Sequence, residues 1–153
     1  MKIIAHRGNL SGPIPDLENC PKHIEKVANS YDVEIDVRVV KNQIFLGHDS
    51  AQYQVSLDWI LKYKDRLWIH CKNLSAMRYF SALKNHNLIY FGHSDDQYVA
   101  VSNGYIFCIG SGEFDHNCII VMPEFFSTKY DLSLVGGVVT DYPLIIKSQI
   151  PLK

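Results

Sequence analysis

Four short polar patches near the start of the chain contain the residue types needed to break a phosphate ester. Two of them contain histidines, His6 and His48, and an ordinary pKa of about 6.5 suits histidine to proton transfer at neutral pH. Arg7 follows the first histidine, and its planar guanidinium can hold two phosphate oxygens at once. Glu34 and Asp36 supply carboxylates that can hold a divalent cation. These residues predict a phosphodiesterase site, although the sequence does not decide which histidine is the acid and which the base.

Three other residues of the patches are predicted to support the site rather than to carry its chemistry. Glu18 is expected to partner Arg7 or His6, and Asn19 lies directly beside it. Asp49 is expected either to orient the histidine that precedes it or to cap the following turn. None of the three is expected to react with the substrate.

Strand-like runs adjoin these patches and would have to position them. They cover residues 3–5, 33–40 and 44–47. In a parallel α/β barrel, polar residues at the C-terminal ends of strands converge on one mouth. Apolar and acidic residues alternate around Glu34 and Asp36, which places both acids on one face of their strand. We expect this face to point into the barrel; the alternative is a strand face exposed to solvent.

The rest of the chain alternates between strand-like and helix-like patterns. Helices are predicted over 21–29, 56–64 and 74–83, and His93 and Glu124 follow later strand-like runs. His93 is either a pocket residue or a satisfied structural histidine, and Glu124 is a candidate carboxylate at the rim of the site. Such alternation predicts a parallel sheet with βαβ crossovers. A (β/α) TIM-type barrel needs about 200 residues or more. A chain of 153 residues therefore predicts a compact barrel with trimmed helices, or an incomplete one.

Composition limits the class of protein. The chain is 47% hydrophobic and 20% charged with a net charge of −1, which is typical of a single globular domain, here residues 1–153. No basic stripe stands out, so we expect no nucleic-acid partner, and no apolar run of membrane-spanning length is present. No signal peptide is recognisable, and the four cysteines show no CxxC spacing, which favours reduced thiols and a cytoplasmic location. Apolar surface left uncovered by missing helices would invite a second copy, so a homo-oligomer is an option.

The motifs and their order resemble those of the glycerophosphodiester phosphodiesterases. The matching segments are 4–8, 18–19, 34–37, 47–49 and 137–143. The resemblance implies a TIM barrel related to the phosphatidylinositol-specific phospholipases C and a role in lipid metabolism. It further implies a calcium or magnesium ion and cleavage of a small glycerol- or polyol-type phosphodiester. It makes His6 and His48 the acid/base pair, Arg7 a phosphate contact, and Glu34 and Asp36 metal ligands.

One position departs from the pattern of that family. Its third strand ends in E-x-K, and here the corresponding run is His70-Cys71-Lys72. Lys72 is retained and is predicted to contact the substrate phosphate. Imidazole in place of a carboxylate disfavours calcium and magnesium and suits manganese or zinc. His70 is therefore either a third metal ligand or a packing residue that makes no metal bond.

The sequence thus predicts a phosphoric diester hydrolase that uses histidine acid/base catalysis and a divalent metal. The alternative is a catalytically weak or inactive protein of the same fold that binds a phosphorylated ligand or a protein partner. The short chain and His70 are the features that motivate this alternative.

Overall fold

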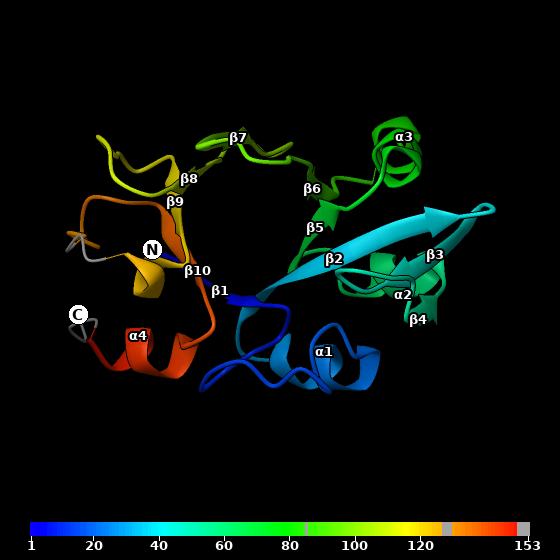
Figure 1. Ribbon diagram of the computed structural model, residues 1–153, viewed down its shortest axis with the longest axis horizontal. Coiled ribbons are helices and arrows are strands. Elements are labelled where there is room, and N and C mark those ends of the chain that lie inside the picture. Colours follow the sequence, from blue (N-terminus) through cyan, green and yellow to red (C-terminus); the bar gives the residue numbers. More distant parts are fainter. Residues whose placement is uncertain (85, 127–129, 150–153) are drawn as a thin grey trace.

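The computed structural model describes residues 1–84, 86–126 and 130–149, and strands dominate this part of the chain (Figure 1). The strands are β1 (Lys2–His6), β2 (Asp32–Val40), β3 (Gln43–Leu46), β4 (Tyr53–Val55), β5 (Leu67–Cys71), β6 (Ile89–Phe91), β7 (Tyr98–Ala100), β8 (Ile106–Ile109), β9 (Cys118–Val121) and β10 (Gly137–Thr140). The helices in the described residues are α1 (Pro21–Val27), α2 (Leu57–Lys62), α3 (Leu74–Ala82) and α4 (Pro143–Gln149), with a 3-10 helix, η1 (Pro123–Phe125).

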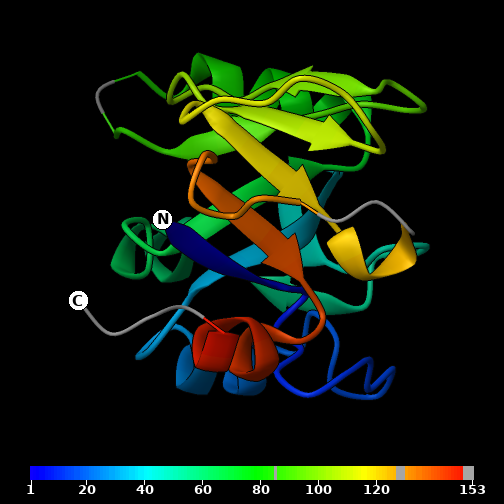
Figure 2. The ribbon, with the colours of Figure 1, turned by 90° about the vertical axis from the view of Figure 1, so that its left-hand side faces the viewer.

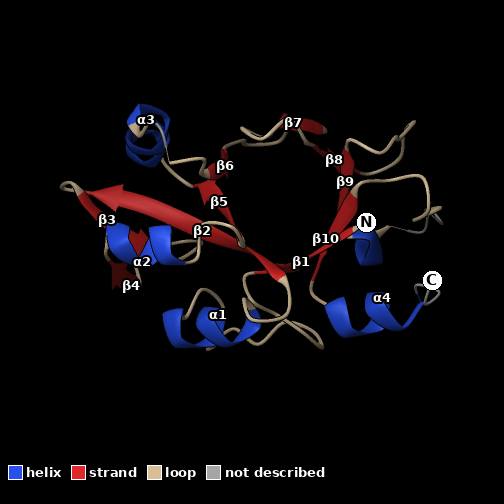
Figure 3. Ribbon diagram, turned by 180° about the vertical axis from the view of Figure 1, so that it is seen from behind, coloured by secondary structure: helices blue, strands red, loops and turns tan. Residues whose placement is uncertain are grey.

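One mixed sheet contains these strands. Eight follow the order β4-β3-β2-β1-β10-β9-β8-β7, and β5 and β6 branch from β2. The pairs along β6-β5-β2-β1-β10-β9-β8 are parallel, whereas β3, β4 and β7 join by antiparallel pairing. The sheet curls into a half-barrel, seen from both sides in Figures 1 and 3. The N–H of Ser102 donates to the carbonyl of Tyr90 on β6 at 3.0 Å, but no strand ladder joins β6 to β7 in the described residues.

The predicted (β/α) TIM-type barrel is therefore wrong. The sheet is mixed rather than all parallel, and the helices among the described residues are too few and too short to form an outer ring. Between β6 and β10 the described connections are loops and the three-residue η1. The loop at 110–117 forms no helix, in keeping with its lack of a helical sequence pattern.

Alternation along the strands separates two apolar clusters. Val33, Ile35 and Val37 of β2 point outward into a core shared with α1, α2 and α3. Trp68 and Phe107 belong to a second cluster, which fills the inside of the curl. Figure 2 shows α4 beside β1 and β10, on the other side of the sheet from that inner cluster. The inner cluster forms an apolar layer that excludes water next to the polar residues at the strand ends.

A tight hairpin follows the acidic residues of β2. Lys41 and Asn42 both have positive φ, at 49° and 66°, between antiparallel β2 and β3. Two consecutive residues of this kind form the turn whose twist matches a two-stranded ribbon. The hairpin brings Gly47 back to the middle of β2, where its N–H donates to the carbonyl of Asp36 at 3.0 Å. The helix predicted over 74–83 is confirmed as α3, with Asn73 capping it by accepting a hydrogen bond from the N–H of Ala76 at 2.8 Å.

Candidate active site

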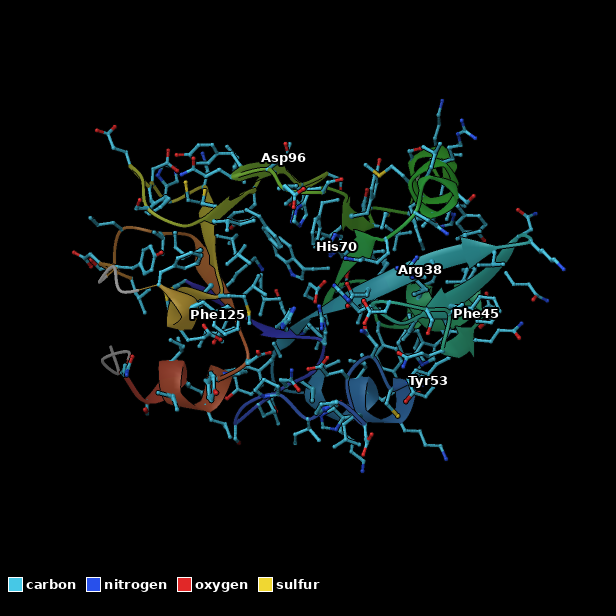
Figure 4. All side chains as sticks on the ribbon, viewed as in Figure 1. Arg38, Phe45, Tyr53, His70, Asp96 and Phe125 are labelled. Carbon is cyan, nitrogen blue, oxygen red and sulfur yellow. The ribbon has the colours of Figure 1, made fainter. Side chains whose placement is uncertain are left out.

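Polar side chains gather where the parallel strands end. His6 is paired in register with Glu34, and Asp36 is paired with His70, so β1, β2 and β5 present these residues at one edge of the sheet. Glu34 and Asp36 are 3% and 1% exposed, which excludes the alternative of a solvent-exposed strand face. Figure 4 shows His70 on β5 within the curl. The carboxyl ends of parallel strands are where ligands commonly bind in such sheets.

His6 forms a hydrogen-bonded dyad with the carboxylate of Asp141, which lies far along the chain. Its Nδ1 lies 2.8 Å from Oδ1 of Asp141, which directly follows β10. Burial lowers the pKa of His6, but the hydrogen bond to Asp141 and the charge of Glu34 outweigh it and leave that pKa raised. With Nδ1 held by a carboxylate, Nε2 is the nitrogen left for proton transfer.

Arg7 lies among carboxylates. Its Nε is 2.9 Å from Oδ2 of Asp36, and its NH1 donates to Oε2 of Glu18 at 3.1 Å. The backbone of Arg7 has a φ of 51°, a conformation that costs energy for a residue with a Cβ atom and turns its N–H toward Oε2 of Glu34 at 3.3 Å. Burial lowers the pKa of Arg7, and Asp36 and Glu34 raise it by more. Glu18 thus partners Arg7, as the sequence predicted.

Glu34, Asp36 and His70 form the group that could hold a metal ion. One ligand atom from each lies within 4.8 Å of the others. Nδ1 of His70 is 3.5 Å from Oε1 of Glu34 and 3.3 Å from Oδ1 of Asp36. That Asp36 oxygen is buried without a hydrogen-bond donor, which is a rare condition for a carboxylate. Atoms that share one cation at about 2.0–2.2 Å lie within about 4.4 Å of one another, so these three residues would hold a cation after a small contraction.

The charges around this group also favour a cation. Burial raises the pKa of Asp36, but the contact with the His70 ring at 3.3 Å and the charge of Arg7 hold that pKa well below its ordinary value. Burial lowers the pKa of His70, whereas the nearby carboxylates of Asp36 and Glu34 raise it by more. Nζ of Lys72 lies 3.9 Å from Oδ1 of Asp36, at the margin of the group. A protonated His70 and a bound metal are therefore competing partners for the same two carboxylates.

Two asparagines support the site by hydrogen bonds, one to Asp141 of the dyad and the other to Asp36 of the candidate metal group. Nδ2 of Asn9 donates to Oδ1 of Asp141 at 2.8 Å and to Oε1 of Glu18 at 2.9 Å. Asn19, with a φ of 58°, donates to Oδ2 of Asp36 at 3.0 Å and accepts from its backbone N–H at 2.9 Å. Asn19 therefore supports the site, as the sequence predicted, while the role of Asn9 has no local sequence signal.

His48 and Asp49 lie apart from these contacts. Nδ1 of His48 is 2.7 Å from Oδ1 of Asp49, so Asp49 orients this histidine as predicted. The carbonyl of His48 accepts a hydrogen bond from Arg38, which shares the inner face of β2. No described contact joins the ring of His48 to the dyad or to the carboxylates. Its role as a second proton carrier stays a prediction.

His93 packs against His70 of the candidate metal group. Its ring stacks on that of His70 with centroids 4.9 Å apart and 6° between the planes. Burial lowers the pKa of His93, and the charges of His70 and Lys72 lower it further. His93 is thus a neutral neighbour of the group, and Asp141 and Asn9 are the residues that sequence reasoning did not place in the site.

The buried charges predict how stability changes with pH. Asp36 and Asp141 have lowered pKa values, so the stability they contribute is present above about pH 4, the ordinary range of aspartate, and is lost as the pH falls. His6 and His70 have raised pKa values, so their contribution is complete below about pH 6.5 and is lost as the pH rises through the folded values. We expect the free energy of unfolding, measured in urea without added metal, to peak between these limits. A free energy that rises steadily toward alkaline pH would contradict this prediction.

Comparisons with known proteins bear on the resemblance. The chain matches no family model, no curated protein and no solved structure. Every helix in the described residues is too short or too polar to cross a lipid bilayer. Together with the mixed, curled sheet, the lack of a family match overturns the assignment to the glycerophosphodiester phosphodiesterases, and with it the implied place in lipid metabolism.

Proposed function

We propose that the protein is a metal-assisted phosphodiesterase that hydrolyses a small phosphodiester. The observation that carries the proposal is the His6–Asp141 dyad at the same sheet edge as Glu34, Asp36 and His70. A proton carrier beside a group that can hold a cation can supply both proton transfer and charge stabilisation for phosphodiester hydrolysis at neutral pH. The glycerol- or polyol-type alcohol was implied by the resemblance alone, and the proposal does not extend to it.

In this reaction a water oxygen bonds to phosphorus and the bond from phosphorus to one alcohol oxygen breaks. His6, oriented by Asp141, takes the proton of the water on Nε2. Arg7 and Lys72 hold the non-bridging oxygens, and the leaving alkoxide takes a proton from a second carrier, for which His48 is the candidate. A metal on Glu34, Asp36 and His70 would supply Lewis-acid stabilisation of the charged phosphoryl group; manganese and zinc suit this ligand set. The products are a phosphomonoester and an alcohol.

A panel of small phosphodiesters, assayed with calcium, magnesium, manganese and zinc, tests the proposal. We expect release of a phosphomonoester with manganese or zinc, and its loss on chelation. An absence of turnover with every metal, on a panel that includes activated aryl diesters, would reject the proposed function.

One observation favours a second candidate, a protein that binds a phosphorylated ligand without cleaving it. The cations of the site already have partners, since Arg7 contacts Asp36 and Glu18, and His70 contacts Glu34 and Asp36. A self-neutralised site of this kind can hold an anion weakly without a metal. Calorimetric binding of an intact phosphodiester, with no product detected by mass spectrometry, would favour this candidate. A cytoplasmic location and a homo-oligomer stay predictions.

Replacing His70 by glutamate is expected to change the metal preference. A third carboxylate beside Glu34 and Asp36 provides the hard oxygen ligands that calcium and magnesium prefer. We expect His70→Glu to bind calcium or magnesium at least tenfold more tightly than the parent in calorimetric titrations, a difference of about 1.4 kcal/mol. His93→Gln, which alters only the neighbouring ring, is the control. An unchanged preference in His70→Glu would show that position 70 is not a metal ligand.

A further inference from the structure

Glu124 approaches the candidate site from outside the sheet. It belongs to η1, which follows β9 after Met122, a residue with a φ of 50°. The N–H of Met122 still donates to the carbonyl of Val139 at 2.8 Å, so β9 and β10 remain joined up to this turn. The chain then turns into Pro123, and the carboxylate of Glu124 reaches the end of β10. In Figure 4, Phe125 marks the position of η1 beside β10.

One oxygen of Glu124 accepts two hydrogen bonds at that end. Oε1 accepts from Oγ1 of Thr140 at 2.9 Å and from the backbone N–H of Asp141 at 2.8 Å. Both residues are almost fully buried, at 1% and 3% exposed. Oγ1 of Thr140 in turn accepts from the N–H of Tyr142 at 3.0 Å. The backbone on both sides of Asp141 is therefore fixed by one carboxylate, directly or through Thr140.

This support matters because Asp141 lies just beyond β10. Its N–H has no strand partner among the described residues and takes the carboxylate of Glu124 instead. A buried N–H without an acceptor is costly, and a charged acceptor gives the stronger kind of hydrogen bond. The side chain of Asp141 then points to the inner face, where its Oδ1 meets Nδ1 of His6.

We infer that Glu124 is a positioning residue for the His6–Asp141 dyad, holding the backbone of Asp141 so that His6 keeps its proton on Nδ1 and presents Nε2 to the substrate. The inference deepens the proposed function and rests on it for its catalytic meaning. It also replaces the idea of Glu124 as a rim carboxylate, since Oε1 of Glu124 is already bonded to Thr140 and Asp141.

Two spectroscopic measurements on the full chain test this inference without any substrate. Hydrogen exchange of the Asp141 amide reports its bond to Glu124, and long-range ¹H–¹⁵N spectra at alkaline pH report which nitrogen of neutral His6 carries the proton. In Glu124→Ala we expect amide protection to fall about tenfold or more. We also expect the Nδ1–H tautomer of His6 to lose its dominance. Glu124→Gln keeps an acceptor oxygen and is expected to restore both values.

Two more variants make the test decisive. Glu124→Asp keeps the charge but withdraws the oxygen, so it should behave like Glu124→Ala, and it serves if the alanine variant does not fold. Glu113→Ala removes an exposed glutamate from the nearby 110–117 loop and should change neither measurement. Parent-like protection and tautomer in Glu124→Ala or Glu124→Asp would overturn the inference. A shifted tautomer in a protein that cleaves no phosphodiester would leave the inference standing and reject the proposed function.

Discussion

Asp36→Asn is expected to abolish binding of manganese or zinc and to lower the free energy of unfolding by about 3 kcal/mol or more. Asp36 is 1% exposed and contacts Arg7, His70 and Lys72, so its neutralisation leaves buried positive charge without a partner. It also removes one of the two carboxylates of the candidate metal group. Calorimetric metal titration and urea unfolding measure the two effects separately.

Asp32 offers a matched control on the same strand and the same face. It is also buried and accepts hydrogen bonds from Lys2 at 3.2 Å, Arg66 at 3.1 Å and the indole of Trp68 at 3.2 Å. Asp32 is the first residue of β2, away from the candidate ligands. Asp32→Asn should therefore destabilise the protein while leaving metal affinity within about twofold of the parent. Metal binding by Asp36→Asn that equals the parent's would contradict the assigned metal site.

His6→Gln is expected to reduce kcat/KM for any phosphodiester that the protein cleaves by about 10²- to 10⁴-fold, the usual contribution of a positioned acid or base. Glutamine fills a similar space but cannot carry a proton between water and substrate. The loss should lie mainly in kcat, because His6 acts on the reacting atoms and does not bind the phosphate. Steady-state kinetics with the best substrate of the panel measure it.

Two other histidines make this result specific. His116 is exposed in the 110–117 loop, and His116→Gln should leave the rate unchanged. His48→Gln decides the open role of His48, since a second proton carrier should cost about as much as His6. A rate within threefold of the parent in His6→Gln would remove His6 from the mechanism.

Residues whose roles depend on local pattern could be predicted from the sequence. Period-two alternation correctly placed Glu34 and Asp36 on the inner face, because an extended strand has no other way to bury Val33, Ile35 and Val37. The cap that Asn73 provides for α3 depends on equally local contacts. The polar pair Lys41-Asn42 lies in the turn between two alternating runs, and the hairpin it forms is incompatible with an all-parallel sheet.

Long-range pairing could not be predicted in the same way. The barrel interpretation extended short strand-end motifs to a whole architecture, although nothing local specifies how many helices cover a sheet or whether its ends join. Asp141 shows no local sign of its role in the site, since its partner His6 lies 135 positions away. The sequence around Asn9 gives no sign of its role, because its two contacts depend on the positions that Glu18 and Asp141 take in the folded protein.

The pairing of β1 with β10 has a consequence for the order in which the protein is made. β1 leaves the ribosome early, yet its partner on one side is β10, the last strand among the described residues. At a synthesis rate of about 5–20 residues per second, the gap lasts on the order of ten seconds. During that interval one edge of β1 is open, and His6 has no Asp141 to meet. The dyad thus forms only after β10 has been made, and we expect chains interrupted before β10 to expose an unpaired apolar strand and to be prone to chaperone binding or aggregation.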